Sequence, residues 1–241
     1  MVSKSSSNGA GRSRAIKNTL ARPLDRATIP IDRVSGVSDV FFTFDDGPHP
    51  TYTMAVAETL EAAGHRGTFF LTGANTERHP DVARRLVSGG HAVGSHSATH
   101  PRSRHSSASA VVRDYLRGHR AVQKAVGRSV PWFRPPYGAH DRRSSAASLI
   151  CRAQVVLWSC DSEDWRPEAT AAAVMASVEG NLVGGAIVLF HDAIMDEPAA
   201  AERGHTVEAV GYLIERLGRE GRRSLALGSE RSATTSDTGI G

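Results

Sequence analysis

The feature that most constrains the fold is a regular alternation of short apolar segments with helical segments after residue 38. Most of the apolar segments do not alternate with polar residues and are rich in β-branched and aromatic side chains, which is typical of strands covered on both faces. The predicted strands are Asp39–Phe44, Gly67–Leu71, His91–Gly94, Trp132–Arg134, Gln154–Ser159, Ala186–Phe190 and Arg223–Leu227.

Helical segments with apolar residues along one face separate these strands. The alternation of strands and helices indicates one α/β domain built on a parallel sheet of about seven strands, and no repeat or linker divides it. The predicted helices are Tyr52–Ala63, Pro80–Ser88, Ser107–Val126, Ser144–Arg152, Ala169–Leu182 and Val207–Glu220.

The length and composition agree with a soluble globular protein. The chain has 241 residues, of which 40% are hydrophobic and 22% charged. No apolar run approaches the roughly 20 residues of a membrane span, so we expect no transmembrane segment. The two cysteines, Cys151 and Cys160, have no zinc-site spacing and fit a reduced protein.

The basic charge of the chain is concentrated at its amino-terminal end. Residues 1–38 hold seven Lys or Arg and two Asp, a balance of +5, whereas the whole chain carries +4. We expect residues 1–38 to be a basic, disordered leader and residues 229–241 a flexible tail around a domain at 39–228. The leader could instead contact an anionic surface, although nothing indicates a specific nucleic-acid partner.

The sequence lacks the apolar core of a secretory signal before Val40. It therefore predicts a cytoplasmic protein, or a secreted or cell-wall protein if a leader has been removed or the start codon misassigned. The oligomeric state is left open.

Polar clusters follow successive predicted strands. The carboxyl ends of parallel strands gather on one face of such a sheet, where ligands bind, so we expect the clusters to form a single site. They are Asp45-Asp46, His96 to His100, Arg134 to Tyr137, Asp161 to Trp165, and His191.

Three residues of these clusters suit a metal ion. Two adjacent carboxylates at the end of an apolar strand repel each other unless a cation offsets their charge. On one helical turn, His96 and His100 would project to the same side, and with Asp46 they would form an open three-ligand site. The alternative is a solvated Asp-Asp-Gly turn beside a chance pair among 11 histidines.

The remaining clusters suit acid–base chemistry. An arginine in a rigid turn, such as Arg134, can hold a buried carboxylate by bidentate bonding. The acids of the Asp161 to Trp165 cluster can orient a histidine or pair with Arg134, and Trp165 can wall a sugar-sized pocket. His191, at a strand end, is the side-chain type that transfers protons near neutral pH. Each cluster taken alone could be structural.

Together, five ordered segments resemble the motifs of the polysaccharide deacetylases, the NodB-homology group also called carbohydrate esterase family 4. The resemblance runs from about Val40 to the last predicted strand. It implies a distorted, incomplete (β/α) barrel and a divalent metal, usually zinc, with cobalt or other ions sometimes accepted. The segments are Thr43 to Gly47, His96 to His100, Arg134 to Tyr137, Asp161 to Trp165, and Leu189 to His191.

The resemblance also implies roles. Asp45 would be the general base, held by Arg134, and Asp46, His96 and His100 would bind the metal. His191 would be the general acid, oriented by Asp164. Substrate and oxyanion contacts would come from the backbone N–H of Tyr137 and from Pro136, Trp165, Leu189 and Asp161. The acid and base need opposite protonation states, which predicts a bell-shaped pH–rate profile.

The predicted function is hydrolysis of the N-acetyl group of an amino sugar, in an oligo- or polysaccharide or an N-acylated small metabolite. Two alternatives are an O-acetyl esterase acting on xylan-type polysaccharide and a non-catalytic glycan-binding relative. The acidic, Ala-rich segment Ala193 to His205 could form a loop over the site and set specificity.

Overall fold

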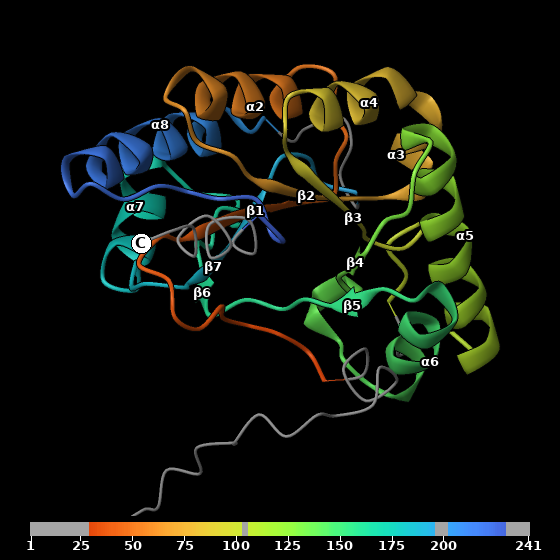
Figure 1. Cartoon of the computed structure of the whole chain (residues 1–241). Coiled ribbons are helices and arrows are strands. Elements are labelled where there is room, and N and C mark those ends of the chain that lie inside the picture. The colour runs from red at the N-terminus through yellow and green to blue at the C-terminus, as the bar shows by residue number, and fades with distance from the viewer. Residues whose placement is uncertain (1–28, 103–105, 196–201, 230–241) are drawn as a thin grey trace, which may run out of the picture.

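Seven parallel strands form a curled sheet in the order β5-β4-β3-β2-β1-β7-β6 (Figure 1). The computed structural model describes residues 29–102, 106–195 and 202–229. An open, curled sheet with helices outside it confirms the predicted α/β fold, a distorted and incomplete (β/α) barrel. The strands are β1 (Phe41–Asp45), β2 (Thr68–Leu71), β3 (Ala92–Ser95), β4 (Trp132–Phe133), β5 (Gln154–Val155), β6 (Cys160–Asp161) and β7 (Ile187–His191).

Helices cover the outer side of the curled sheet (Figure 1). All six predicted helices are present with end shifts of a few residues, and a short helix, α3, was not predicted because six residues carry little periodic signal. The helices are α2 (Tyr52–Ala62), α3 (Gly73–Arg78), α4 (Pro80–Ser88), α5 (Ala108–Val126), the 3₁₀ turn η2 (Pro136–Gly138), α6 (Arg142–Cys151), α7 (Ala171–Glu179) and α8 (Gly204–Arg219).

Two strand predictions were wrong. The segment Gln154–Ser159 is not one strand. The chain pairs with β4 only at residues 154–155, forms a single bridge from Val156 to Ile31, leaves the sheet, and pairs again at residues 160–161 on the opposite edge. The intervening residues thus cross the open side of the barrel. The segment Arg223–Leu227 forms a single bridge, Ser224 to Val40, because β1 already pairs with β2 and β7 on its two sides.

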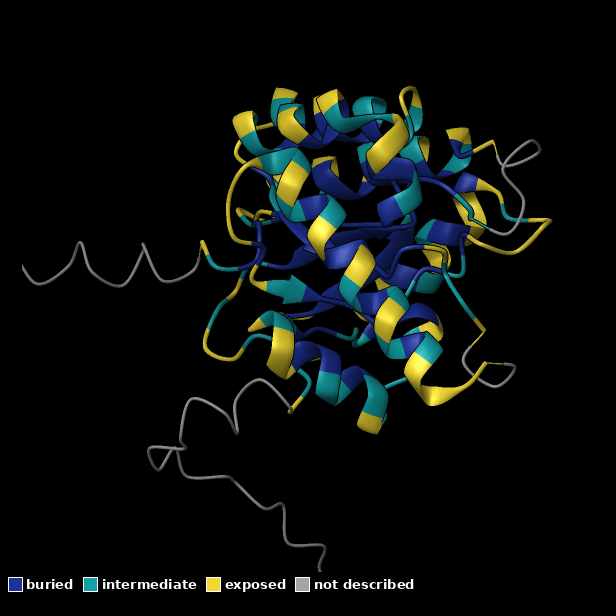
Figure 2. Cartoon of the chain, turned by 90° about the vertical axis from the view of Figure 1, so that its right-hand side faces the viewer, coloured by how far each residue is buried: buried dark blue, intermediate teal, exposed yellow. Residues whose placement is uncertain are grey.

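The sheet separates two apolar layers because successive strand side chains point to opposite faces. Phe42, Phe44 and Phe190 pack in the larger layer, under the helices, whereas Phe41 and Ile187 pack on the concave side. All five side chains are fully buried, and the burial of each stabilises the fold by about 1.5–3 kcal/mol relative to exposure. Burial is concentrated in the sheet, and exposed residues lie on the outer helices (Figure 2).

Residues 29–38, which the sequence places in the leader, instead pack on the domain. The backbone of Ile31 hydrogen-bonds to Val155 and Leu157, with N···O distances of 3.0 and 2.7 Å, and Val34 donates to Gly185. The ordered domain therefore begins before Asp39. The predictions for residues 1–28 and 230–241 lie outside the described residues.

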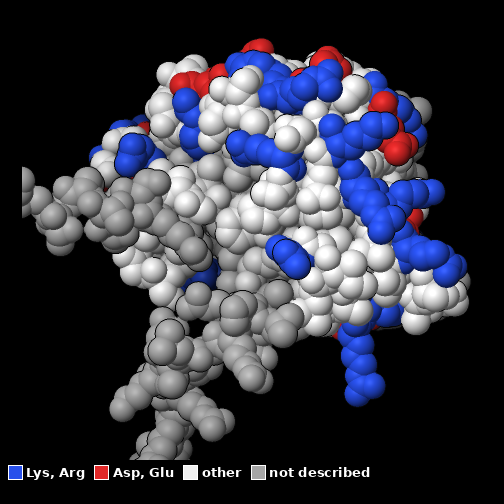
Figure 3. Space-filling model, turned by 45° about the vertical axis from the view of Figure 1, so that its right-hand side comes forward, with Lys and Arg blue, Asp and Glu red and all other residues white. Residues whose placement is uncertain are grey.

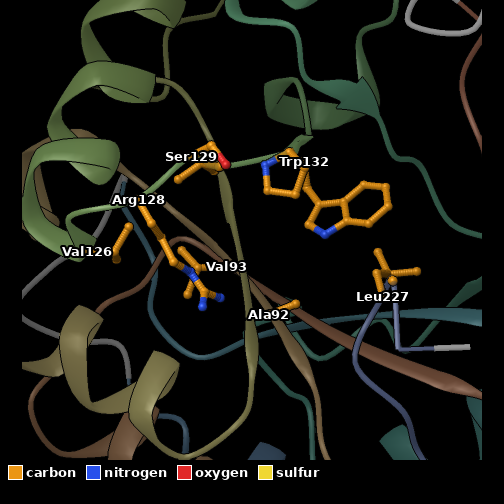
Figure 4. Close-up of a pocket in the computed structure, with 10 residues that line it drawn as sticks. Ala92, Val93, Val126, Arg128, Ser129, Trp132 and Leu227 are labelled. Carbon is orange, nitrogen blue, oxygen red and sulfur yellow. The ribbon is translucent and has the colours of Figure 1, made fainter. Parts of the chain in front are cut away.

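A pocket of about 190 Å³ lies at the amino ends of β3 and β4, where Trp132 and Leu227 face each other (Figure 4). The polar clusters follow the carboxyl ends of the strands, so this pocket is remote from them. Among the described helices, none has the length and apolar character needed to cross a membrane.

Candidate active site

Asp45 ends β1 and is held by Arg134, which follows β4. One guanidinium nitrogen, Nη1, lies 2.8 Å from Asp45 Oδ1 and also donates to Thr43 Oγ1 at 2.9 Å. Arg134 is fully buried and Asp45 almost so. A pair this deeply buried is favourable only where hydrogen bonds satisfy the remaining donors, so the other contacts of Arg134 decide its role.

The remaining donors of Arg134 are bound by backbone carbonyls. Nε donates to Val156 O at 3.2 Å and Nη2 to Leu157 O at 2.9 Å, both in the segment that crosses the open side of the barrel. The guanidinium also lies over the Phe70 ring, 4.2 Å from its centroid. Arg134 and Asp161, which the sequence suggested as a pair, form no direct hydrogen bond or ion pair, since Asp161 Oδ1 accepts from the backbone N–H of Glu163. Burial lowers the pKa of Arg134, and the charge of Asp161 still acts against that larger lowering.

His96 and His100 follow β3 in a loop, not on a helical turn as predicted. Ser97 and His100 have φ values of 67° and 54°, in the left-handed region that non-glycine residues rarely adopt. The backbone N–H of His100 donates to Ser97 Oγ at 2.9 Å. This turned-back loop still places the two imidazoles together, with ring centroids 5.0 Å apart.

Helix α5 fixes this loop through two residues that the sequence analysis missed. Asp114 accepts from the backbone N–H groups of Ala98 and Thr99, at 2.9 and 3.2 Å. A Cβ on Gly118 would overlap the backbone carbonyl of Ser97, so the loop can approach the helix only at a glycine. An acidic residue and a glycine on the face of a basic helix were the only sequence signals for this contact.

Asp46, His96 and His100 form the cluster whose ligand atoms all lie within 4.8 Å of one another. Asp46 Oδ1 lies 3.6 Å from His96 Nε2 and 3.5 Å from His100 Nε2. These separations are too long for hydrogen bonds but match the roughly 3.4 Å between neighbouring ligands of a tetrahedral ion at about 2.1 Å.

Two further observations fit a cation at this position. Asp46 Oδ1 is buried and has no hydrogen-bond partner among the described residues. His96 Nδ1 lies 2.8 Å from Arg134 O, so it donates there and leaves Nε2 as the electron-pair donor that faces the cluster. Burial lowers the pKa of His96, which favours the neutral ring that a metal requires. The three residues therefore suit a divalent metal.

His191 ends β7, the strand next to β1, and is held by Asp164. Asp164 Oδ1 lies 2.8 Å from His191 Nδ1, while Oδ2 accepts from the His191 backbone N–H at 2.8 Å. Burial alone lowers the pKa of His191, but the charge and hydrogen bond of Asp164 outweigh it and raise that pKa to about 9. Burial raises the pKa of Asp164, yet its contacts with His191 leave it below the ordinary value. The ring is thus held as imidazolium near neutral pH.

Asp164 is in turn held by residues near the start of α8, none of which sequence reasoning had found. Thr206 Oγ1 donates to Asp164 Oδ2 at 2.8 Å. Arg203 Nη1 and His205 Nε2 contact Asp164 O at 2.8 and 3.0 Å. The segment Ala193 to His205, predicted to lie over the site, thus contributes at its end to holding Asp164; its residues 196–201 lie outside the described residues.

Asp192 supports the turn after β1. It accepts from the backbone N–H of Gly47 at 3.1 Å and from Thr53 Oγ1. A Cβ at position 47 would collide with the Asp192 carboxylate, so Gly47 permits this close contact. Burial raises the pKa of Asp192 to about 7. The sequence analysis gave this residue no role, although it directly follows His191.

The other predicted site residues surround this centre more loosely. The Tyr137 ring lies 4.5 Å from that of His100 and is half exposed, and Pro136 is buried beside it. Leu189 is buried on the same face of β7 as His191, two residues away. Trp165 is half exposed, next to Asp164. Within the described part of the chain, the predicted residues thus converge on the carboxyl ends of the strands, with Asp161 turned to its own loop.

Comparison with known proteins agrees with this geometry. The sequence model of the family described as "Polysaccharide deacetylase" matches residues 33–154. The chain belongs to the polysaccharide deacetylase family. A "Chitooligosaccharide deacetylase" of Bradyrhizobium sp. (strain ANU 289) is 36% identical to this chain over 195 residues, which cover 78% of this chain and 88% of the relative.

Two further members of the deacetylase family are described as peptidoglycan deacetylases. "Peptidoglycan-N-acetylglucosamine deacetylase PgdA" of Listeria monocytogenes serotype 1/2a (strain 10403S) is 35% identical over 153 residues, or 64% of this chain and 32% of the relative. The structure of the Bc1960 peptidoglycan N-acetylglucosamine deacetylase superposes with a TM-score of 0.75 at 25% identity, covering 86% of this chain and 94% of the other. The predicted family and deacetylase class are confirmed.

Proposed function

We propose that this protein is a divalent-metal-dependent hydrolase that removes the acetyl group from N-acetylglucosamine units of an oligo- or polysaccharide. An N-acylated small metabolite is the alternative substrate of the same chemistry. The deacetylase relatives support the reaction class. The main support is the placement of Asp45 and His191, which lie side by side on adjacent strands next to the cluster of Asp46, His96 and His100. Each is bound by a buried residue of opposite charge, Arg134 for Asp45 and Asp164 for His191.

Asp46, His96 and His100 would hold the metal, for which we propose zinc because one carboxylate and two imidazoles are a common open zinc ligand set. A divalent ion there would polarise the acetyl carbonyl and make water more acidic. Cobalt or another divalent ion suits the same donors.

Asp45 is the proposed general base. Arg134 binds its Oδ1, while Oδ2 lies 3.7 Å from His96 Nε2 and so faces the metal cluster. From this position Asp45 takes a proton from water as the water oxygen bonds to the acetyl carbon. Arg134 thus positions the base and, through its carbonyl oxygen, also orients His96.

His191 is the proposed general acid. Asp164 binds its Nδ1, so Nε2 carries the proton that passes to the departing nitrogen as the carbon–nitrogen bond breaks. The products are acetate and the free amine. Without this proton an amine would be a very poor leaving group, and the raised pKa of His191 keeps the proton available.

The turn at Tyr137 is the proposed oxyanion contact. Tyr137 has a φ of 58°, so its backbone leaves the helical conformation at this residue. Its ring lies against that of the proposed ligand His100. A backbone N–H donor to the developing oxyanion is worth about 2.7–4 kcal/mol. Pro136 makes this turn rigid, and we assign Leu189 and Trp165 to the pocket for the acetyl methyl group.

The test is acetate release by the metal-loaded protein from N-acetylglucosamine oligomers, acetylated xylan and N-acetylated small metabolites. Asp45→Asn is the control, because it keeps the side-chain shape and removes the base. We expect release from N-acetylglucosamine oligomers that the control abolishes. Release from xylan alone would indicate an O-acetyl esterase, and no release with about one metal bound per chain would overturn the proposal.

A further inference from the structure

A groove of about 480 Å³ lies between the first turns of α5 and α6. Three apolar residues, Ala108, Val112 and Ala146, line it together with Ser109 and three arginines, Arg113, Arg142 and Arg143. Arg143 is paired with Asp141 through Nε at 2.7 Å. Arg113 and Arg142 are exposed and form no ion pair with any described residue. The groove therefore combines positively charged and apolar lining residues.

The surrounding surface is also basic. Residues 106–152 contain nine Lys or Arg, one of them the buried Arg134, but only two acids, Asp114 and Asp141, and both acids are paired with arginines. Arg113, Arg117, Arg120 and Lys124 are exposed along one face of α5, at helical spacing. In Figure 3, Lys and Arg side chains extend down the right-hand part of the surface, and most of the visible acidic ones lie above.

The groove is connected to the active site by a short described segment. It runs from Tyr137 to Arg142, five Cα–Cα steps that span at most about 18 Å. On the side of the active site, the Arg102 guanidinium lies 5.5 Å from the Tyr137 ring centroid. A polymer bound with one sugar at Asp45 can therefore continue over Tyr137 toward the groove.

We propose that this groove binds carboxylate groups carried by the amino-sugar polymer whose acetyl group the active site removes. This inference rests on the proposed function and narrows its substrate to an acidic glycan strand. Guanidinium groups bind carboxylates through paired hydrogen bonds, and the apolar lining residues can contact the carbon atoms that carry the carboxylate. A neutral N-acetylglucosamine oligomer makes neither contact. The position of the groove near the site and its apolar lining residues favour such a strand over a nucleic acid, which would bind mainly through phosphates.

The test compares two forms of one substrate. Amino-sugar strands whose alternate sugars carry a lactyl carboxylate are assayed intact and after conversion of the carboxylates to methylamides. The ratio of kcat/KM for the acidic and amidated strands cancels any partial loss of folded enzyme. We expect a ratio of about ten in the parent, falling toward one as salt screens the charges.

Matched double variants locate the effect. The variant Arg113→Gln/Arg142→Gln should reduce the ratio to near one, whereas Arg120→Gln/Lys124→Gln, with the same loss of charge farther along α5, should leave it close to the parent value. A ratio near one in the parent would overturn the inference. An equal fall of the ratio in both double variants would overturn it as well.

Binding measured by calorimetry separates this inference from the proposed function. If neither strand releases acetate, the proposed function fails, yet tighter binding of the acidic strand that depends on Arg113 and Arg142 still supports the groove. Equal binding of both strands would refute it. A DNA duplex that binds more tightly than the acidic strand, through both pairs of basic residues, would identify a general polyanion surface instead.

Discussion

Asp45 and His191 are register partners on β1 and β7, so the proposed base and acid stand on neighbouring strands at the same height of the sheet. Neighbouring strands lie about 4.8 Å apart, which leaves both side chains able to contact one acetamide group. Each is bound by a buried group from another part of the chain, Arg134 for Asp45 and Asp164 for His191.

Replacing Arg134 should impair both folding and activity. Arg134→Met leaves Asp45 buried without its cation and three backbone or hydroxyl contacts unmade, so we expect a loss of about 3–5 kcal/mol in the free energy of unfolding. Remaining folded enzyme should lose about 100-fold in kcat. Denaturant unfolding and acetate release check the two effects. Arg120→Met, which changes an exposed arginine of α5, is the control, and a similar change in both variants would contradict the assignment.

The alkaline limit of activity should depend on Asp164. A general acid works while protonated, and the pKa of His191 is raised to about 9, so kcat/KM should be maintained below that pH and fall above it. Asp164→Asn removes the largest contribution that raises this pKa, while burial still lowers it and Asp45 and Asp46 still raise it, so the alkaline limb should move to lower pH. The pH–rate profiles of the two proteins measure this shift. An unmoved limb would assign it to another group.

The same pair makes stability depend on pH. The folded pKa of His191 lies above its unfolded value, so the stabilisation is complete below about pH 6.5 and is lost as pH rises through about 9. Urea midpoints at pH 6 and pH 10 should therefore differ more in the parent than in Asp164→Asn. Equal differences would show that the pair contributes little to folding.

Metal binding should require the histidines of the loop after β3. We expect about one zinc per chain in the parent and near zero in His96→Ala and His100→Ala. The chain has 11 histidines, so His79→Ala, between α3 and α4, is the matched control for adventitious binding. Metal analysis after dialysis gives the stoichiometry. Equal zinc content in all three variants would place the ion elsewhere.

Gly118 should be required for the position of that loop. A methyl group at this position overlaps Ser97, so Gly118→Ala should cost about 1–3 kcal/mol in unfolding free energy and weaken zinc binding. Gly218→Ala, in α8, meets open space and should instead stabilise the fold by about 0.5–1 kcal/mol. Thermal unfolding and zinc titration of both variants measure the contrast. Unchanged zinc affinity in Gly118→Ala would mean that the loop tolerates displacement.

The amino-acid sequence by itself determined the fold class, six of the described helices and the residues of the proposed site. Helical periodicity and unalternating apolar segments report local burial, and Asp46, His96, Arg134 and His191 were recognisable because each follows a strand and has the chemistry its site needs. The groove between α5 and α6 and the residues that hold Asp164 had no such signal. Thr206 contacts Asp164 across 42 residues of chain, and no local pattern encodes that pairing.

Only the tertiary structure decided how the backbone places these groups. The segment after Gln154 looks like one strand, but it divides because β5 and β6 lie on opposite edges of the open barrel. The spacing of His96 and His100 suggests a helical turn, but packing against Gly118 and Asp114 forces a loop with positive φ angles. Residue type and spacing express local preferences, whereas strand pairing and close backbone contacts depend on which distant segments pack together.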